Sequence, residues 1–118
     1  MDIGTWAEEF GAAITICDEH GVIVAMNEKA ARTHAKSGGR ALIGANLLDC
    51  HPEPARHKLE TLLREQGRNS YTIEKAGMRK LIHQGPWFEG GVFRGLVELS
   101  IEIPVDMAHF VRSTESGG

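Results

Sequence analysis

Cys50 and His51 stand side by side in the chain, and both side-chain types serve as metal ligands and in nucleophilic catalysis. A catalytic thiolate needs a base within hydrogen-bond reach, roughly 2.6–3.2 Å away, and a third group that orients the base. Adjacent residues rarely point the right way, and the sequence offers no evident orienting group. We therefore do not expect an enzyme, and we interpret Cys50 as a buried thiol that packs like a small apolar side chain.

Metal ligation is the second chemistry that these residue types offer. No Cys-x-x-Cys or His-x-x-x-His pair is present, so a zinc site is not expected. Haem needs only one axial histidine in an apolar pocket. His51 continues the apolar stripe of Ala55 and Leu59, whereas His57 falls on the polar side of the same segment. Haem ligation by His51 is one alternative, and a histidine that only hydrogen-bonds the backbone at a helix start is the other.

The elements before this pair follow from periodicity and turn chemistry. Residues 12–18 and 22–26 are β-like runs, and Gly21 between them is expected to adopt a positive φ in a hairpin. Asn27 then stands at the N-cap position of a helix predicted over 28–36.

The segment around the pair is predicted to be the start of a longer helix. Pro52 suits its first turn, which leaves His51 near the N-cap, and the helix runs to about Gln66. Its apolar stripe consists of Ala55, Leu59, Leu62 and Leu63.

The last part of the chain alternates as strands do. Runs are predicted over 71–75, 79–88 and 92–103, with a hairpin turn before the last one. Two strands cannot form a stable sheet alone, so all five are expected in one antiparallel sheet with the helices packed on one face. This order predicts the α+β class.

The ends of the chain are predicted to differ from the domain over 12–112. Residues 1–11 read as an N-terminal amphipathic helix with the apolar stripe Ile3, Trp6 and Phe10, which we interpret as a dimer contact. The alternative is a helix folded back on its own sheet. Residues 113–118 read as a flexible polar tail.

Composition excludes several classes of protein. The net charge of −3 and the lack of a lysine or arginine run argue against direct binding of nucleic acid. No apolar run approaches the ~20 residues of a membrane span, and no signal peptide is recognisable, so a cytoplasmic protein without membrane partners is expected.

Three segments carry motifs in a recognisable order. They are Asp18-x-x-Gly21-x-Ile23-x-x-x-Asn27, Leu42-Ile-Gly44-x-Asn46-Leu47-Leu48-x-x-His51-Pro52-Glu53, and Gly95-Leu96-Val97-Glu98-Leu99-Ser100. Together with the order of the elements, they resemble the PAS domain, a sensor module of signalling proteins. The segments 80–88 and 102–112 are similar to those of small stand-alone bacterial PAS proteins, a subgroup that implies no particular function.

The resemblance implies strand order 2-1-5-4-3, frequent dimerisation through flanking helices, and a cavity between sheet and helices. Either the protein's own side chains fill that cavity or it holds a small ligand. We predict that its lining consists of Ile16, Leu47, Leu48, His51, Leu59, Leu62, His83 and Trp87. No flavin is expected, because Leu47 stands where the flavin-binding relatives carry their reactive cysteine directly after Asn46.

The predicted function is therefore a sensory or signalling domain that binds a small ligand or a signalling protein partner, for example in the regulation of transcription. Unless the sequence is a fragment of a longer protein, the output is expected to pass through contacts of a homodimer or through a partner. Two alternatives remain, a haem sensor that uses His51 and a pure protein-interaction module, and a small enzyme ranks last.

Overall fold

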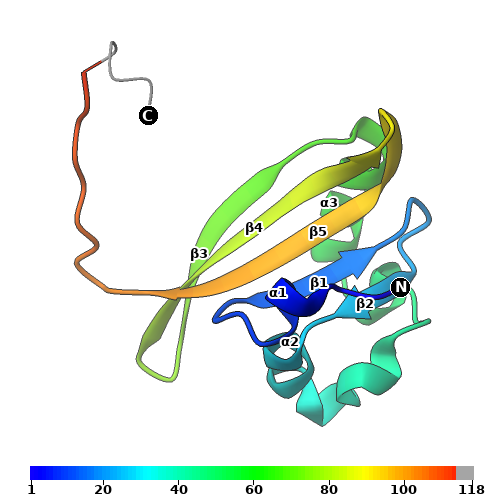
Figure 1. Cartoon of the computed structure of the whole chain (residues 1–118), viewed down its shortest axis with the longest axis horizontal. Helices are drawn as coiled ribbons and strands as arrows, with labels where there is room; N and C mark the ends of the chain where they lie inside the picture. Colours follow the sequence, from blue (N-terminus) through cyan, green and yellow to red (C-terminus); the bar gives the residue numbers. More distant parts are fainter. Residues whose placement is uncertain (114–118) are drawn as a thin grey trace.

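A five-stranded antiparallel sheet in the order β2-β1-β5-β4-β3 forms the body of the molecule (Figure 1). The structure is a computed structural model, and it describes residues 1–113. The strands are β1 (Ala13–Cys17), β2 (Ile23–Met26), β3 (Asn69–Lys75), β4 (Met78–Glu89) and β5 (Val92–Ile103). The predicted α+β class and strand order are confirmed. Most of the tail predicted over 113–118 lies outside the described residues.

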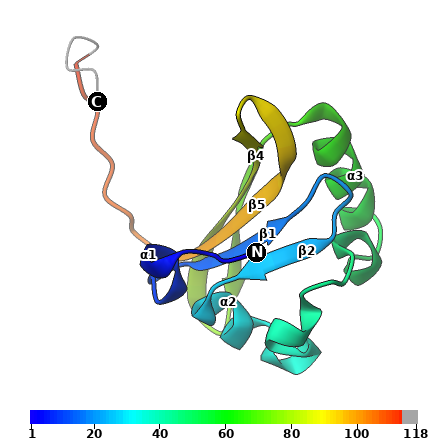
Figure 2. The same cartoon turned by 45° about the vertical axis from the view of Figure 1, so that its right-hand side comes forward.

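Most helical segments cover one face of this sheet, while the N-terminal helix lies on the other side (Figures 1 and 2). In chain order they are α1 (Thr5–Glu8), α2 (Glu28–Thr33), the short 3-10 helices η1 (Ala35–Ser37), η2 (Gly39–Leu42) and η3 (Leu47–Cys50), and α3 (Ala55–Glu65). Within residues 1–113, no helix has the length and apolar character that crossing a membrane requires.

The N-terminal helix is shorter than the predicted segment 1–11. It has one turn, because Gly4 at its N-cap has a φ of 93° and the Asp2 carboxylate accepts only the amide of Gly4, at 3.0 Å. Trp6 and Phe10 are 73% and 52% exposed, and their rings meet edge to face with centroids 6.0 Å apart. The aromatic part of the predicted stripe therefore faces outwards.

Asn27 ties this N-terminal segment to the rest of the fold. The predicted N-cap is confirmed, since its Oδ1 accepts the amides of Ala30 and Ile14, both at 3.0 Å. Its Nδ2 donates to the carbonyls of Ala7 and Ala12, at 2.9 and 2.8 Å. The side chain is fully buried, so four hydrogen bonds satisfy both ends of its amide.

Strand alternation gives the sheet two faces, here called the inner face, which α2 and α3 cover, and the outer face (Figure 2). Ladder partners point to the same side, so the pairing assigns each residue to a face. The central inner-face residues are Ala13, Thr15, Cys17, Met26, Ile82, Gln84, Leu96, Glu98 and Ser100. The central outer-face residues are Ile14, Ile16, Leu81, His83, Val97, Leu99 and Ile101.

The apolar core on the inner face is divided into two clusters. One contains Ala13, Ile23, Met26 and Ala30, and the other contains Cys17, Leu59, Leu62 and Leu96. Leu47 of η3 packs against both clusters. The division leaves space between them, which η3 and η1 partly enclose.

The long helix begins later than predicted. Pro52 does not begin it, since α3 runs from Ala55 and Pro54 stands at its N-cap. Pro54 disfavours helical backbone at Glu53, so the first turn cannot form before it. The Glu53 carboxylate instead accepts the amide of His57, at 2.8 Å. His51 is therefore not at the N-cap but in the connection between η3 and α3.

Candidate functional site

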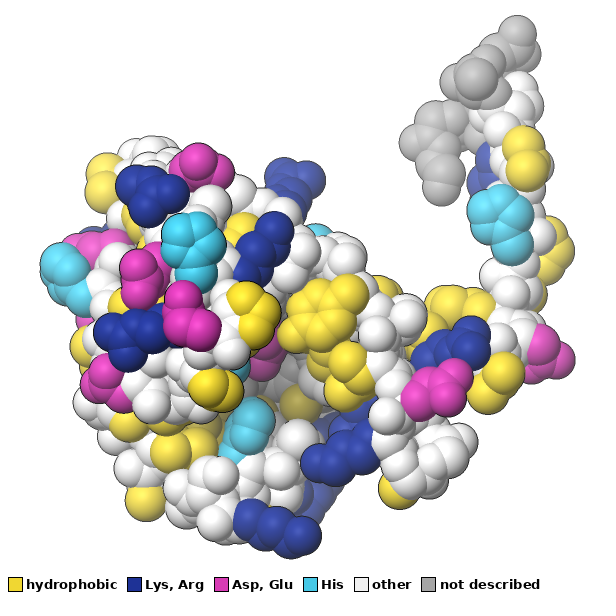
Figure 3. All heavy atoms as spheres, turned by 180° about the vertical axis from the view of Figure 1, so that it is seen from behind, with side chains coloured by type: hydrophobic (Ala, Val, Ile, Leu, Met, Phe, Trp, Pro, Cys, Tyr) yellow, Lys and Arg dark blue, Asp and Glu magenta, His cyan; other side chains and the backbone are white. Residues whose placement is uncertain are grey.

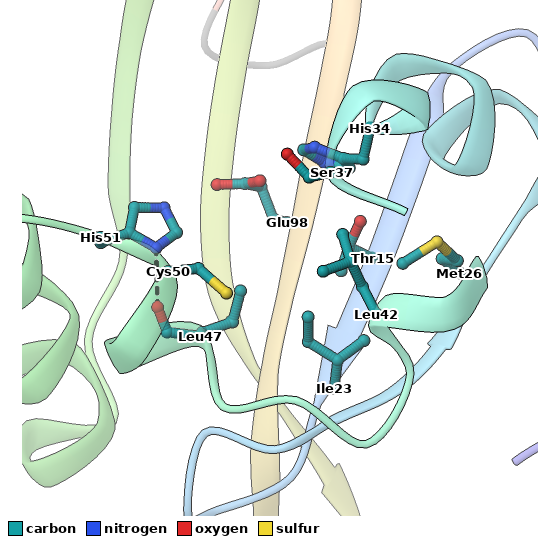
Figure 4. A pocket seen from close by; sticks show the side chains of 10 residues that line it. All are labelled: Thr15, Ile23, Met26, His34, Ser37, Leu42, Leu47, Cys50, His51 and Glu98. Atoms are coloured by element: carbon teal, nitrogen blue, oxygen red, sulfur yellow. Dashed lines mark hydrogen bonds between the residues drawn. The ribbon is translucent and has the colours of Figure 1, made fainter. Parts of the chain in front are cut away.

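A cavity of about 430 Å³ opens between the inner face and the helical segments, and Figure 3 shows this side of the molecule hollowed near its centre. Its volume lies within the range of about 300–1,000 Å³ that is usual for small-molecule sites. The lining consists of Thr15, Ile23, Met26, His34, Ser37, Leu42, Leu47, Cys50, His51 and Glu98 (Figure 4). It therefore combines an apolar part with several polar side chains.

A polar row crosses the inner face, and its members Thr15 and Glu98 lie at the floor of this cavity. Thr15 pairs with Glu98, Glu98 with Gln84, and Gln84 with Asn69 in consecutive strands. The Gln84 Nε2 donates to the Glu98 carboxylate at 2.8 Å, and the Asn69 Nδ2 donates to Gln84 Oε1 at 3.1 Å. Packed cores are normally apolar at such positions, so this row is available to contact a bound molecule.

His51 forms the opposite wall, and hydrogen bonds fix its position. Its Nδ1 lies 2.7 Å from the Leu47 carbonyl oxygen (Figure 4). The Leu47 amide donates to the Gly21 carbonyl at 2.8 Å, and Asn46 Nδ2 donates to the His20 carbonyl at 3.0 Å. Because Gly21 has a φ of 86°, as expected, the β1–β2 turn can approach η3 closely.

Arg56 of α3 holds η3 from the other side. Its Nη1 donates to the Leu48 carbonyl at 3.1 Å, and its Nε donates to the Glu60 carboxylate at 3.2 Å. The segment that carries His51 is thus attached both to the sheet and to α3. A change in the cavity can therefore reach elements on two sides.

Part of the predicted lining lies at the cavity. Leu47 and His51 line it directly, and Leu59 lines a small adjoining hollow with His51 and Gln84. Leu62 belongs to the second core cluster, and Leu48 packs against that cluster rather than facing the cavity. Whether a ligand contacts any of these residues stays a prediction.

Three predicted lining residues lie on the outer face and are corrected here. Ile16 alternates with Thr15, and His83 alternates with Gln84, so both side chains point away from the helices. His83 Nδ1 lies 2.6 Å from the Ser70 Oγ, and Trp87 Nε1 donates to the Cys17 carbonyl at 3.1 Å. The prediction fails because alternation along a strand does not show which of its two faces meets the helices.

The polar lining was missed for the same reason. Thr15, Glu98 and Gln84 alternate with apolar residues, and such polar positions normally face solvent. His34 and Ser37 lie around the end of α2, in and beside η1, where sequence periodicity gives no signal. The one signal present in the sequence is the regular spacing of Glu98, Ser100 and Glu102 along the last strand.

The two thiols differ in their surroundings. Cys50 is exposed at the cavity, so its predicted burial is wrong. Cys17 is buried beneath α3, and burial raises the pKa of its thiol to about 11, with smaller contributions from the charges of Asp18 and Glu98. A raised pKa opposes thiolate formation, which is the reverse of what a nucleophile needs. Between Met1 and Ser113 no cluster of three or more His, Cys, Asp or Glu side chains is placed to hold a metal.

Tyr71 faces a neighbouring hollow that also contains His51 and Gln84. Partial burial raises the pKa of its phenol, and the negative charge of Glu98 raises it further. The phenol therefore remains a neutral hydrogen-bonding group at the edge of the polar row.

Several solved structures share this fold. They include a sensory box sensor histidine kinase from Vibrio cholerae, with a TM-score of 0.61 and 19% identity over 85% of this chain and 87% of that chain. The PAS domain of BvgS from Bordetella pertussis has a TM-score of 0.62 and 18% identity, over 85% of this chain and 82% of that chain. The Aer2 receptor from Vibrio cholerae, a dual PAS-heme oxygen sensor, has a TM-score of 0.58 and 17% identity, over 79% of this chain and 95% of that chain.

The comparison of sequences gives a family but no close relative. No curated protein matches the chain. The family model described as PAS fold matches residues 7–74, which is more than half of the sequence and includes β1, β2 and the segment that carries His51. With the strand order and the cavity between sheet and helices, this match establishes that the chain belongs to the PAS family.

Proposed function

We propose that this PAS domain is a non-catalytic sensor that binds a small molecule in the cavity between its sheet and its helices. The observation that carries the proposal is the pair of polar residues Thr15 and Glu98 at the floor of a 430 Å³ space. Gln84 continues this row beside the cavity and lines two adjoining hollows. A fold that only needed a core would place apolar side chains there. The non-catalytic part of the proposal is supported by Cys17, whose thiol is held protonated, and by His51, whose Nδ1 is engaged by a backbone carbonyl.

Native mass spectrometry of freshly purified protein tests the binding of a ligand. We expect a retained small molecule, or a mass shift after incubation with a metabolite extract. A protein that carries no added mass in either experiment would instead be a pure protein-interaction module. A thermal-shift screen of the same extract, fractionated by size, provides an independent readout that does not require slow dissociation.

We further propose that the signal passes through a homodimer that uses α1 and the outer face. Trp6 of α1 and Phe10, two residues after the end of this helix, are exposed, and α1 lies on the outer-face side (Figure 2). The outer face beside them is apolar and only half-buried over Ile16, Leu81, Val97, Leu99 and Ile101. Aromatic side chains beside an apolar patch are typical of interfaces. A ligand that prefers one packing of helix and sheet would shift the population that the dimer presents.

Light scattering on the double variant Trp6→Glu, Phe10→Glu tests this interface. We expect the mass to fall from that of a dimer to that of a monomer. Phe88→Glu is the matched control, because Phe88 is 51% exposed but lies near the β4–β5 turn. A dimer mass that the double variant leaves unchanged would remove α1 from the interface.

A haem sensor is the second candidate, and one observation favours it. If His51 Nδ1 donates to the Leu47 carbonyl, Nε2 is left without its proton, as an axial ligand requires. The Glu98 carboxylate in the same cavity counts against an apolar haem pocket. Absorbance spectra of protein expressed with added haem decide the matter, since no Soret band means no haem. A band that His51→Ala abolishes would support the haem sensor.

A further inference from the structure

The Glu98 carboxylate is a charge without a counter-charge. It projects from β5 into the cavity between His51 on one side and His34 and Ser37 on the other (Figure 4). Among residues 1–113, no basic side chain pairs with it within 4 Å, although eight other pairs are formed. Partly buried carboxylates are usually paired, because removal from water costs free energy. The cavity therefore supplies a carboxylate whose charge no basic side chain among residues 1–113 neutralises by direct pairing.

The hydrogen bonds of the polar row end at this carboxylate. A carboxylate only accepts, so the Gln84 amide must turn its NH₂ group towards Glu98 and its oxygen towards Asn69. The Gln84 amide thereby orients the carboxylate without neutralising it. The carboxylate has more acceptor positions than this one donor uses, and they face the cavity.

His51 presents a second acceptor to the same space. The Leu47 carbonyl can only accept, so the 2.7 Å contact assigns the proton of the neutral ring to Nδ1. The Nε2 of that tautomer accepts a hydrogen bond. Two acceptors on different walls of one cavity require a ligand that is rich in N–H or O–H donors.

Two lysines near Glu98 influence how much positive charge a ligand in the cavity can carry. Lys75 and Lys80 line a smaller hollow that Glu98, Thr15 and His34 also border. Lys75 is exposed and Lys80 is half-exposed on the β3–β4 hairpin, so water solvates both ammonium groups. Glu98 instead lies in the larger cavity, where an interaction with an opposite charge is screened less. The lysines oppose a ligand with a second positive charge on that side.

We propose, on the basis of the sensor function above, that the ligand is a small organic monocation of the amidinium, guanidinium or primary ammonium class. Its charged nitrogen donates to Glu98, and a further N–H reaches His51. Its apolar body lies on the apolar part of the lining, which consists of Ile23, Met26, Leu42 and Leu47. A planar N–H fork would match the carboxylate with two parallel hydrogen bonds.

Three probes of nearly the same shape test this inference, namely benzamidinium, benzamide and benzoate, which carry positive, zero and negative charge. Each is titrated into ¹⁵N-labelled protein, and affinities are read from the amide shifts of Thr15, Leu47 and Glu98. We expect benzamidinium to bind about 10- to 100-fold more tightly than benzamide, as one charge-assisted hydrogen bond allows. Benzoate is expected to bind most weakly.

The variant Glu98→Gln isolates the charge. Its side-chain oxygen still accepts from Gln84, so the row and the fold are retained. The affinity for benzamidinium should fall to that for benzamide, while the affinity for benzamide stays the same. Glu102→Gln is the matched control, because it removes the same charge from the same strand and face, at a residue that lies 3.7 Å from Lys29. It should leave the preference intact.

The outcomes separate this inference from the proposed function. If benzamide or benzoate binds as tightly as benzamidinium, or if Glu98→Gln keeps the preference, the cation class is wrong while the sensor function stands. If none of the three probes binds up to its solubility limit, the cation class is contradicted, and the native mass spectrometry described above decides separately whether the cavity binds a ligand.

Discussion

The two faces of the sheet differ in polarity at its centre. The inner face, which the helices cover, carries Thr15, Glu98 and Gln84 across its three central strands. The outer face carries Ile16, Val97 and Leu99, and α1 lies on that side. Both apolar core clusters nevertheless lie on the inner face under the helices, as is usual for an antiparallel sheet with one covered face. The polar residues between these clusters support the proposal that the inner face contacts a bound molecule, and the half-buried apolar residues of the outer face support the proposal that it contacts another surface.

Asn27 connects the two sides, and its replacement has the largest expected effect. Asn27→Ala removes four hydrogen bonds that join α1, β1 and α2, and it leaves several buried backbone groups without partners. We expect the free energy of unfolding to fall by about 4 kcal/mol, since each unsatisfied buried group costs about 1–3 kcal/mol. Urea denaturation followed by circular dichroism measures the loss.

The matched control is Asn69→Ala at the end of the polar row. Asn69 makes one side-chain hydrogen bond, at 3.1 Å to Gln84, and is half-buried, so water can replace it. We expect a loss of about 1 kcal/mol or less. If both variants lose similar amounts, Asn27 is not the connection between the faces.

Gly95 marks a point where the outer face of β5 admits no side chain. Its φ is 148°, and an added Cβ would lie 1.9 Å from the Cys17 carbonyl oxygen, which also accepts the Trp87 Nε1 proton. Because that oxygen belongs to the backbone of β1, Gly95→Ala must displace a strand. We expect it to destabilise the fold by about 3 kcal/mol in the same denaturation experiment.

Gly91→Ala provides the comparison within the same hairpin. Gly91 has a φ of 81°, but no atom lies within 4 Å of an added Cβ. Gly91→Ala therefore introduces only the strain of a left-handed backbone conformation, and we expect it to lower the free energy of unfolding by about 1–2 kcal/mol. Equal losses at the two glycines would show that the close approach to β1 has little energetic weight.

The buried thiol of Cys17 makes the stability of the fold depend on pH, and the exposed thiol of Cys50 offers a control. Folding raises the pKa of Cys17 from 9.0 to about 11, so the unfolded chain ionises first as the pH rises. The stabilisation of the fold by the neutral Cys17 thiol is complete below pH 9. It is lost as the pH rises through 11, which lowers the free energy of unfolding by about 2 kcal/mol. Denaturation series at pH 8, 9, 10 and 11 measure this slope.

Cys17→Ala should flatten most of that slope, while Cys50→Ala should keep it, because Cys50 is exposed at the cavity. The raised pKa of Tyr71 acts in the same direction and should leave a small residual slope in Cys17→Ala. A slope that does not change in Cys17→Ala would assign the alkaline loss to other groups.

Local sequence signals predicted the strands, turns and helix caps of this fold well. The strand over 92–103, the positive φ at Gly21 and the N-cap at Asn27 are set by neighbouring residues, and they appear as expected. The start of α3 was misplaced by three residues, because Pro52 and Pro54 compete for the same role. Each of these features depends on contacts within a short segment of chain.

The candidate site was harder to predict, because it depends on which face of each strand turns inwards. Alternation shows that Glu98 and Leu99 point to opposite sides, but not which side meets the helices. The predicted lining therefore included Ile16, His83 and Trp87, which lie on the outer face, and left out Glu98. His51 and Leu47 were found because they lie in a connection whose motifs do not depend on the choice of face.

Replacing the polar pair of the inner face is the most direct test of why its polarity exists. In the double variant Gln84→Leu, Glu98→Leu, both partners of the 2.8 Å hydrogen bond are removed together, so neither is left unpaired. Apolar replacement of both members of a pair is often neutral or stabilising. We expect an unfolding free energy within about 1 kcal/mol of the natural protein, together with loss of the preference for benzamidinium. A loss of more than about 2 kcal/mol would mean that the row holds the sheet together, and the difference between the faces would then serve the fold rather than a ligand.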